Sequence, residues 1–308
     1  MLKSFTAASL NLVAGALLLL LLGVAPVWAA EQVYSETRFR FKDSAELVVV
    51  APRGYERAAV LLARSIEKLH SALESSLGSL PPFSTQLRML EEEEFYTSTG
   101  APRWTNALYF RNQIIIPINN KSVEQSDALL RSVRHEYTHA AIHALSGGRC
   151  PGWLDEGLAQ WWEGAENPAL RPALARWMQQ NNHVPFYLLQ GGFTRLDEGM
   201  VAAAYGQSLI ASTSLTRTYG YQALRSYLDY LRRGDSKPNA FHKAFGLHED
   251  AFEIRIGSSL KRWAESTRLH TASATSVRTV SSRQPVTLGG LQRARAEAEV
   301  RAVPRPSE

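Results

Sequence analysis

The chain has 308 residues, of which 45% are hydrophobic, so it is long enough to bury a sizeable core. Its formal net charge of +5 lies mostly near the ends, because Lys3 supplies one unit and residues 264–308 carry seven Arg against four Glu; the near-neutral remainder argues against nucleic acid as a partner. A single cysteine, Cys150, excludes an internal disulfide, and its loop position leaves open whether it is a bystander, a thiolate ligand or a redox group.

The first thirty residues have the pattern of a secretory signal. Lys3 is their only charged side chain, an apolar run extends from Leu12 to Val24, and mostly small residues follow up to Ala30. We therefore predict a signal peptide at residues 1–29, cleaved near Ala29, and an exported protein that is periplasmic or secreted. The alternative is an uncleaved membrane anchor, since the uncharged run is long enough to span a bilayer.

Strand and helix patterns alternate after the signal, which predicts an N-terminal α/β subdomain at residues 30–122. Strands are expected at 45–51, 85–90 and 107–118, the last as a strand or a hairpin, and helices at 55–77 and 91–96. These elements predict a small mixed sheet. Pro117 indicates that residues 112–118 form an edge strand, where a missing N–H donor is tolerated.

The segment His135-Glu136-Tyr137-Thr138-His139 lies in a predicted helix at 126–146. Residues i and i+4 share one helix face, so both imidazoles can bind one ion, with Zn–N bonds of roughly 2.0–2.1 Å. Glu136 lies about 100° round the helix, which suits a base acting on water at the metal and not a ligand. His143 lies about 12 Å from His135 along the axis, so we place it outside the ligand set, on the helix face or behind the ligands.

A hydrolytic zinc site usually has three protein ligands and one open position, so the two histidines need a third partner. Glu156 is the candidate, because it lies near the start of a second amphipathic helix predicted at 151–162. If that helix packs on the first, its carboxylate can point back at both histidines. The result would be the His₂Glu set of a catalytic zinc site.

The His-Glu-x-x-His segment and the later Trp153-Leu154-Asp155-Glu156-Gly157-Leu158-Ala159 resemble the gluzincin metallopeptidases, especially peptidase MA-like domains, and are more distantly similar to the catalytic domains of M1 aminopeptidases. The resemblance covers roughly residues 45–265. It implies a zincin-like α+β fold, with a small mixed sheet in the N-terminal part, a mainly helical C-terminal part and the active-site helix between them. It also implies one Zn²⁺ per chain held by His135, His139 and Glu156, with Glu136 as the general base.

The resemblance also implies roles for residues outside the ligand set. In such folds a sheet edge pairs with extended substrate, so Ile114 and Ile116 are candidates for substrate binding; the alternative is that they fill the core. Tyr205 matches a tyrosine that hydrogen-bonds the oxyanion, or it is a core aromatic. Some members have Asp four residues after the third ligand to orient a histidine. Here that position is Gln160, so Asp155 or a backbone carbonyl is expected to serve instead.

Residues 123–265 are predicted to form the helical, zinc-binding catalytic part. After Glu156, helices are expected at 168–181, 199–219, 221–233, 238–245 and 249–265. Residues 266–308 lack aromatic residues and are rich in Ser, Thr, Arg, Ala and Pro, which predicts a disordered basic tail. Its arginines either stay solvated or contact an anionic envelope surface weakly.

Taken together, these patterns predict an exported zinc-dependent metallopeptidase that hydrolyses peptides or proteins through metal-activated water. Two alternatives come from other functional classes. One is a binding or scaffold protein with a structural zinc site, although such sites usually have four ligands and favour Cys. The other is a catalytically weak zinc-site protein that acts by contact as a cell-envelope binding or assembly factor.

Overall fold

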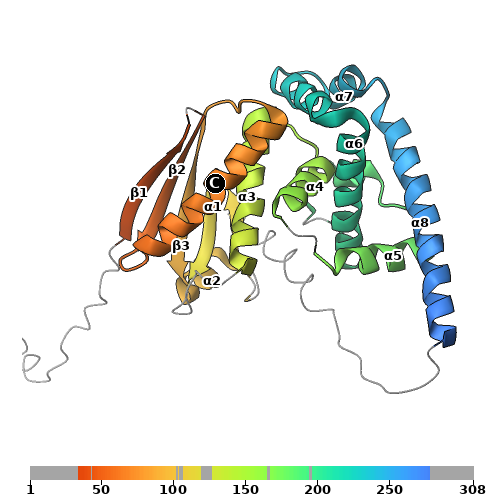
Figure 1. Ribbon diagram of the computed structural model, residues 1–308, viewed down its shortest axis with the longest axis horizontal. Coiled ribbons are helices and arrows are strands. Elements are labelled where there is room, and N and C mark those ends of the chain that lie inside the picture. The colour runs from red at the N-terminus through yellow and green to blue at the C-terminus, as the bar shows by residue number, and fades with distance from the viewer. Residues whose placement is uncertain are drawn as a thin grey trace, which may run out of the picture. The chain divides into compact units, whose positions relative to one another are not determined.

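The structure is a computed structural model that describes residues 34–42, 44–101, 103, 107–118, 127–164, 167–193 and 196–277 (Figure 1). These residues belong to one compact unit that begins at Tyr34. The predicted signal peptide and residues 278–308 of the predicted tail lie outside the described residues. Within the described ranges, no helix combines the length and the hydrophobicity needed to cross a bilayer.

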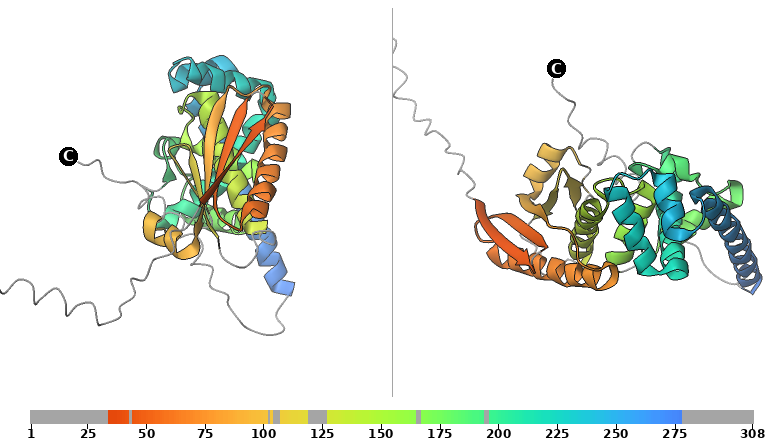
Figure 2. Two further views of the ribbon diagram at one scale, coloured as in Figure 1. Left: turned by 90° about the vertical axis from the view of Figure 1, so that its left-hand side faces the viewer. Right: turned by 90° about the horizontal axis from the view of Figure 1, so that it is seen from above.

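The N-terminal part is a five-stranded mixed sheet with the strand order β1-β2-β3-β5-β4. Figures 1 and 2 show this sheet with α1 beside it. Its strands are β1 Tyr34–Phe41, β2 Ala45–Pro52, β3 Phe83–Glu91, β4 Leu108–Phe110 and β5 Gln113–Ile118. Strands β2, β3 and β5 are parallel, whereas β1 and β4 pair antiparallel at the two edges. The small mixed sheet of the predicted α+β class is therefore confirmed.

Helices make up most of the rest of the described chain. They are α1 Glu56–Leu77, α2 Glu92–Thr99, α3 Asp127–Ser146, α4 Gly152–Trp162, α5 Leu170–Gln180, the 3₁₀ helix η2 Phe186–Leu189, α6 Glu198–Arg232, α7 Lys237–Phe245 and α8 Glu249–Val277. Every helix predicted between residues 55 and 265 is present. The zincin-like arrangement follows, with α3 packed against the sheet on one side and against α4 and α6 on the other.

Burial explains why these segments fold as they do. Strand β2 is almost fully buried on both faces, as expected for a central strand with parallel pairing, and Leu47 and Val49 are inaccessible to solvent. Helix α1 buries Leu62, Ile66 and Leu73 at helical spacing, contacts β1 and β2, and also packs on α3. The sheet and α1 thus hold α3 in place.

The structure differs from the sequence-based prediction at three elements. Strand β1 was not predicted, because its charged residues leave only a weak strand signal, with every second residue exposed over much of its length. Helix α8 continues to Val277, so the predicted tail start at residue 266 is wrong; residues 266–277 contain neither Pro nor Gly to stop the helix. Helix α6 joins two predicted helices across a non-helical Gly220, whose φ is 80°.

The edge strand is also reassigned. Strand β5 lies between β3 and β4, so the outer strand is β4 and not the predicted 112–118 segment. Ile114 and Ile116 have no exposed surface and belong to the main hydrophobic core. Their proposed contact with substrate is therefore corrected: the side chains of β5 that alternate with them are the more accessible ones, and these two fill the core.

Candidate metal centre

Helix α3 places two histidines one turn apart on the face that meets α4. The rings of His135 and His139 have centroids 4.8 Å apart and planes at 78°. Val133, Tyr137 and Ala141 on the same helix are fully buried, which fixes the rotation of α3 about its axis. His143 is exposed, as expected for a residue outside the ligand set.

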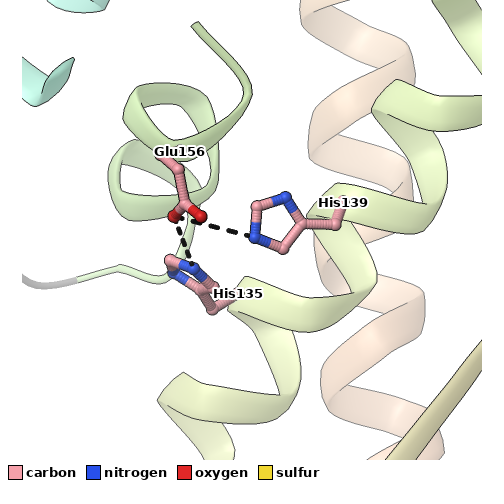
Figure 3. A group of neighbouring side chains, drawn as sticks. All are labelled: His135, His139 and Glu156. Atoms are coloured by element: carbon pink, nitrogen blue, oxygen red, sulfur yellow. Dashed lines mark ion pairs between the residues drawn. The ribbon is translucent and has the colours of Figure 1, made fainter. Parts of the chain in front are cut away.

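Helix α4 brings a carboxylate to these rings. The Oε2 atom of Glu156 lies 3.5 Å from Nε2 of His135 and 3.9 Å from Nε2 of His139, and Figure 3 shows Glu156 reaching towards both imidazoles. Gly157 permits this approach, because a Cβ atom there would overlap with Ser212 Oγ and the Ser208 carbonyl oxygen of α6. The glycine that follows Glu156 in the sequence is thus needed for close packing of α4 on α6.

The three side chains fit a zinc ion. Their potential ligand atoms all lie within 4.8 Å of one another, and they are the one such group of three or more among the residues that the structure describes. Tetrahedral zinc with bonds of about 2.0–2.1 Å places neighbouring ligand atoms about 3.3–3.4 Å apart. The two histidine–glutamate separations, 3.5 and 3.9 Å, are close to this value, and the group as a whole, which extends to 4.8 Å, would contract around the ion. Two neutral nitrogens and one carboxylate are the donors of a catalytic zinc site with an open fourth position.

Each imidazole also contacts a carboxylate through its other ring nitrogen, Nδ1. Nδ1 of His135 lies 2.8 Å from Glu163 Oε2, and Nδ1 of His139 lies 3.0 Å from Asp155 Oδ2. Because Nδ1 is engaged in both rings, Nε2 is the nitrogen available to a metal. The structure therefore places Asp155 where the sequence led us to expect an orienting carboxylate.

Gln160 lies in a different position from the one expected of an orienting residue. Its side-chain nitrogen donates to the main-chain carbonyls of Glu156 and Tyr205, each at 3.1 Å, and so ties α4 to α6. The carboxylate on His135 comes instead from Glu163, which the sequence reading did not single out. The available signal was its spacing: seven residues from Glu156, or two turns along the same face of α4.

Arg134 fixes the end of α4 from the neighbouring helix. Its Nε donates to the main-chain carbonyl of Glu163 at 2.8 Å, which satisfies a carbonyl at the helix terminus. The next residue, Gly164, has a φ of 104°, and a Cβ there would lie 3.2 Å from the guanidinium of Arg134. The backbone of Glu163 is thus positioned from the same helix that carries His135.

Residues 97–262, more than half of the chain, match the sequence profile of the Peptidase MA superfamily. The chain belongs to the peptidase MA superfamily. Solved structures with a similar fold include an M1 zinc metallopeptidase from Deinococcus radiodurans, at 15% identity and a TM-score of 0.39 over 75% of this chain and 51% of that one. No curated protein sequence matches this chain.

Two further structures similar to this peptidase MA chain belong to aminopeptidases. Legionella pneumophila aminopeptidase A, solved with aspartic acid, has 14% identity and a TM-score of 0.44, with 73% of this chain and 28% of that one covered. An aminopeptidase N family protein from Idiomarina loihiensis has 12% identity and a TM-score of 0.42, with 72% and 46% covered. This chain therefore spans about half or less of the length of these structures.

The candidate base of this peptidase MA chain, Glu136, is 7% exposed and follows His135 directly on α3. Tyr205 lies on α6 and is 6% exposed, with its ring edge-on to Phe193 at 5.0 Å. Its carbonyl accepts the hydrogen bond from Gln160, one turn beyond the third candidate ligand. Tyr205 is thus a packed aromatic on the α6 turn next to α4, and its contact with an oxyanion stays a prediction.

Tyr109 also lies beside the candidate metal centre, although it was not predicted there from the sequence. It lies on β4, and its ring stacks on His139 with centroids 6.3 Å apart and planes at 23°. Burial, followed by the charges of Asp155 and Glu136, raises the pKa of Tyr109 to about 12, so its phenol stays protonated. Its place on a three-residue strand left no motif to find it by.

Burial and neighbouring charges also shift the pKa values of His139 and Cys150 in this peptidase MA chain. Burial disfavours the charged form of His139, but Asp155, and then Glu156 and Glu136, raise the pKa of its imidazole to about 10 in the metal-free protein. Burial raises the pKa of the Cys150 thiol well above its usual value, which disfavours the thiolate needed for a ligand or redox role.

Proposed function

We propose that this chain is an exported zinc metallopeptidase that hydrolyses peptide bonds of peptides or proteins. The observation that carries the proposal is the His135, His139 and Glu156 group, with ligand atoms within 4.8 Å and both imidazoles held at Nδ1 by carboxylates. Membership of the peptidase MA superfamily supports the same reaction class. Export rests on the signal pattern of residues 1–29.

In this proposal each residue has a defined task. His135, His139 and Glu156 hold one Zn²⁺, which when bound polarises the peptide carbonyl and makes water a better nucleophile. Glu136 accepts a proton from the attacking water and passes it to the leaving amine. Glu163 and Asp155 keep the imidazoles in the tautomer that leaves Nε2 free. Tyr205 donates a hydrogen bond to the negatively charged oxygen that forms on the substrate.

The proposal is tested by measuring bound zinc and peptide-library cleavage with the purified chain and with Glu136→Gln. Wild type should bind one zinc per chain and cleave peptides. The variant should bind the same amount of zinc and lose roughly 10²–10⁴-fold in turnover, which is the contribution expected of a general base. Full turnover in Glu136→Gln would contradict the base assignment, and a wild type without zinc or cleavage would contradict the function.

The same experiment separates the proposed enzyme from a zinc-site protein that acts by contact. Such a protein would bind zinc and cleave nothing in either form. The three-ligand group supports the enzyme, because structural zinc sites are usually closed by four ligands and favour Cys. Cys150, the chain's one cysteine, has a raised pKa that disfavours its thiolate.

A further inference from the structure

Tyr109 stands where the sheet borders the metal centre. Strand β4 is the last strand in the sheet order, so one of its sides pairs with β5 and the other has no strand partner among the residues that the structure describes. Tyr109 and Ile114 are opposite each other in this pairing, so both side chains lie on the face that α3 covers. The ring of Tyr109 is therefore stacked on the ring of His139 at this edge of the sheet.

A tight turn holds the hydroxyl of this tyrosine. Arg111 and Asn112, which join β4 to β5, have φ values of 48° and 63°, so both adopt the left-handed region that a two-residue type I′ hairpin requires. Glycine is usual at the second position, and asparagine is among the few other residues that tolerate the left-handed region. Here Asn112 Oδ1 accepts a hydrogen bond from the Tyr109 hydroxyl at 3.0 Å.

The turn itself is anchored to the neighbouring strand, so it can act as a fixed support. The main-chain carbonyl of Asn112 accepts from the Thr85 hydroxyl at 2.8 Å and from the main-chain N–H of Gln86 at 3.0 Å. Thr85 is 2% exposed, whereas Asn112 is exposed and Tyr109 is half-buried. The hydrogen bond between Tyr109 and Asn112 thus lies at the open side of the site, where a ligand can compete for the hydroxyl.

We propose that Tyr109 contacts the substrate directly: its hydroxyl leaves Asn112 and donates to a carbonyl oxygen of an extended peptide lying along the free side of β4. This proposal rests on the proposed peptidase function and adds one substrate contact to it. The hydroxyl already donates to the side-chain oxygen of Asn112 at 3.0 Å, so a peptide carbonyl oxygen would replace one oxygen acceptor with another. The ring packs against the peptide next to His139.

Two variants separate direct contact from support of the hairpin. Tyr109→Phe removes only the hydroxyl, and Asn112→Gly removes the competing acceptor while keeping a residue that accepts a φ of 63°. Each is prepared as the full chain with zinc, and its affinity for a dipeptide hydroxamate is measured by calorimetry. Acetohydroxamate, which offers the zinc-binding group without a peptide, serves as the second probe.

Tyr109→Phe should bind the dipeptide hydroxamate about three- to tenfold more weakly, as expected for one lost hydrogen bond, and acetohydroxamate equally well. Asn112→Gly should bind the dipeptide probe as tightly as wild type or more tightly, because the hydroxyl no longer has to leave an acceptor. Thermal unfolding of each variant confirms that it is folded.

Three results would overturn the proposal. Equal weakening in both variants would mean that Tyr109 acts only by supporting the hairpin. Weaker acetohydroxamate binding in Tyr109→Phe would mean that it acts through His139 and the metal. Unchanged binding of both probes would mean that it makes no contact. A wild type that binds zinc but neither hydroxamate would instead remove the proposed function, and the Tyr109 contact with it.

Discussion

At the scale of single residues, the metal centre depends on carboxylates behind the histidines. Glu163 lies 2.8 Å from Nδ1 of His135, so replacing it with Ala should let that imidazole rotate and should weaken zinc binding by about 10- to 100-fold. Glu163→Gln should lose less, because an amide oxygen still accepts a hydrogen bond from Nδ1. Competition with a fluorescent zinc chelator measures both affinities. Glu67→Gln, at an exposed position, serves as the control, and wild-type affinity in Glu163→Ala would contradict the orienting role.

Protonation of His139 makes zinc binding depend on pH. The pKa of His139 in the metal-free fold, about 10, lies above the ordinary 6.5, so the protonated ring contributes stability below pH 6.5 that is lost as the pH rises through about 10. Zinc needs the neutral ring, so its apparent affinity should rise with pH across this window. Calorimetry at pH 7.5 in buffers of different ionisation enthalpy should show about one proton released per zinc from His139.

Asp155→Asn tests the cause of that proton release. It removes the charge that does most to raise the pKa of His139, so proton release should become smaller and the pH dependence of zinc affinity shallower. Intrinsic affinity should also fall, because the ring loses its partner at Nδ1. Proton release equal to that of wild type would show that Asp155 is not the cause.

At the scale of elements, the distance between α4 and α6 determines where Glu156 lies. Gly157→Ala should therefore reduce the free energy of unfolding by about 1–3 kcal/mol, because its Cβ would overlap with Ser212 and with the backbone of Ser208. Zinc affinity should fall with it, since α4, which carries Glu156, must shift away from α6. Urea unfolding and chelator competition measure the two effects.

Gly199→Ala is the matched control for that substitution. It also adds one methyl to a helical glycine, but a Cβ there meets no atom within 4 Å. It should leave zinc affinity unchanged and stability equal or slightly higher, because alanine favours the helix. A similar loss in both variants would mean that the α4–α6 contact is not the reason for the glycine.

The elements were predictable to different extents for physical reasons. Helices such as α1 and α5 bury apolar residues at regular helical spacing, so their presence and approximate ends follow from the sequence. Strand β1 pairs through its backbone at a sheet edge with exposed charged side chains, so little apolar patterning marks it. The order of β4 and β5 depends on long-range pairing, which local patterns do not contain, and this is why Ile114 and Ile116 were misassigned.

At the scale of the whole molecule, the site residues that were predicted are close in sequence, and those that were missed are brought to the site by long-range packing. The three candidate ligands lie on consecutive helices, α3 and α4, in one short stretch of sequence, so their pattern can be recognised from the sequence. Tyr109 comes from the sheet edge, and the α6 residue Tyr205, whose carbonyl holds Gln160 of α4, lies about fifty residues beyond Glu156. Their positions follow only from how α3 packs between the sheet and the helical part.

A buried polar chain connects these parts of the molecule behind the metal helix. Ser44 Oγ lies 2.8 Å from Nε2 of His70 on α1, and Nδ1 of His70 lies 3.0 Å from the hydroxyl of Tyr137 on α3. Ser44 also donates to Glu74, which pairs with Lys42 at the surface. With Ser44 donating to Glu74, the arrangement is satisfied by a neutral His70 that carries its proton on Nε2.

The hydrogen-bonded group of Ser44, His70 and Tyr137 should make the stability of the whole fold sensitive to acid. Burial, the largest effect, lowers the pKa of His70 below 6.5, with Glu74 opposing and Lys42 adding to the shift. The unfolded chain therefore takes up a proton near pH 6.5 before the folded one does, so this stability is fully present above pH 6.5 and is lost as the pH falls towards the folded pKa. His70→Gln should remove that component. Urea unfolding of the zinc-free proteins at pH 8, 6 and 5 should show a smaller acid-induced loss in the variant, and parallel losses in both proteins would contradict this assignment.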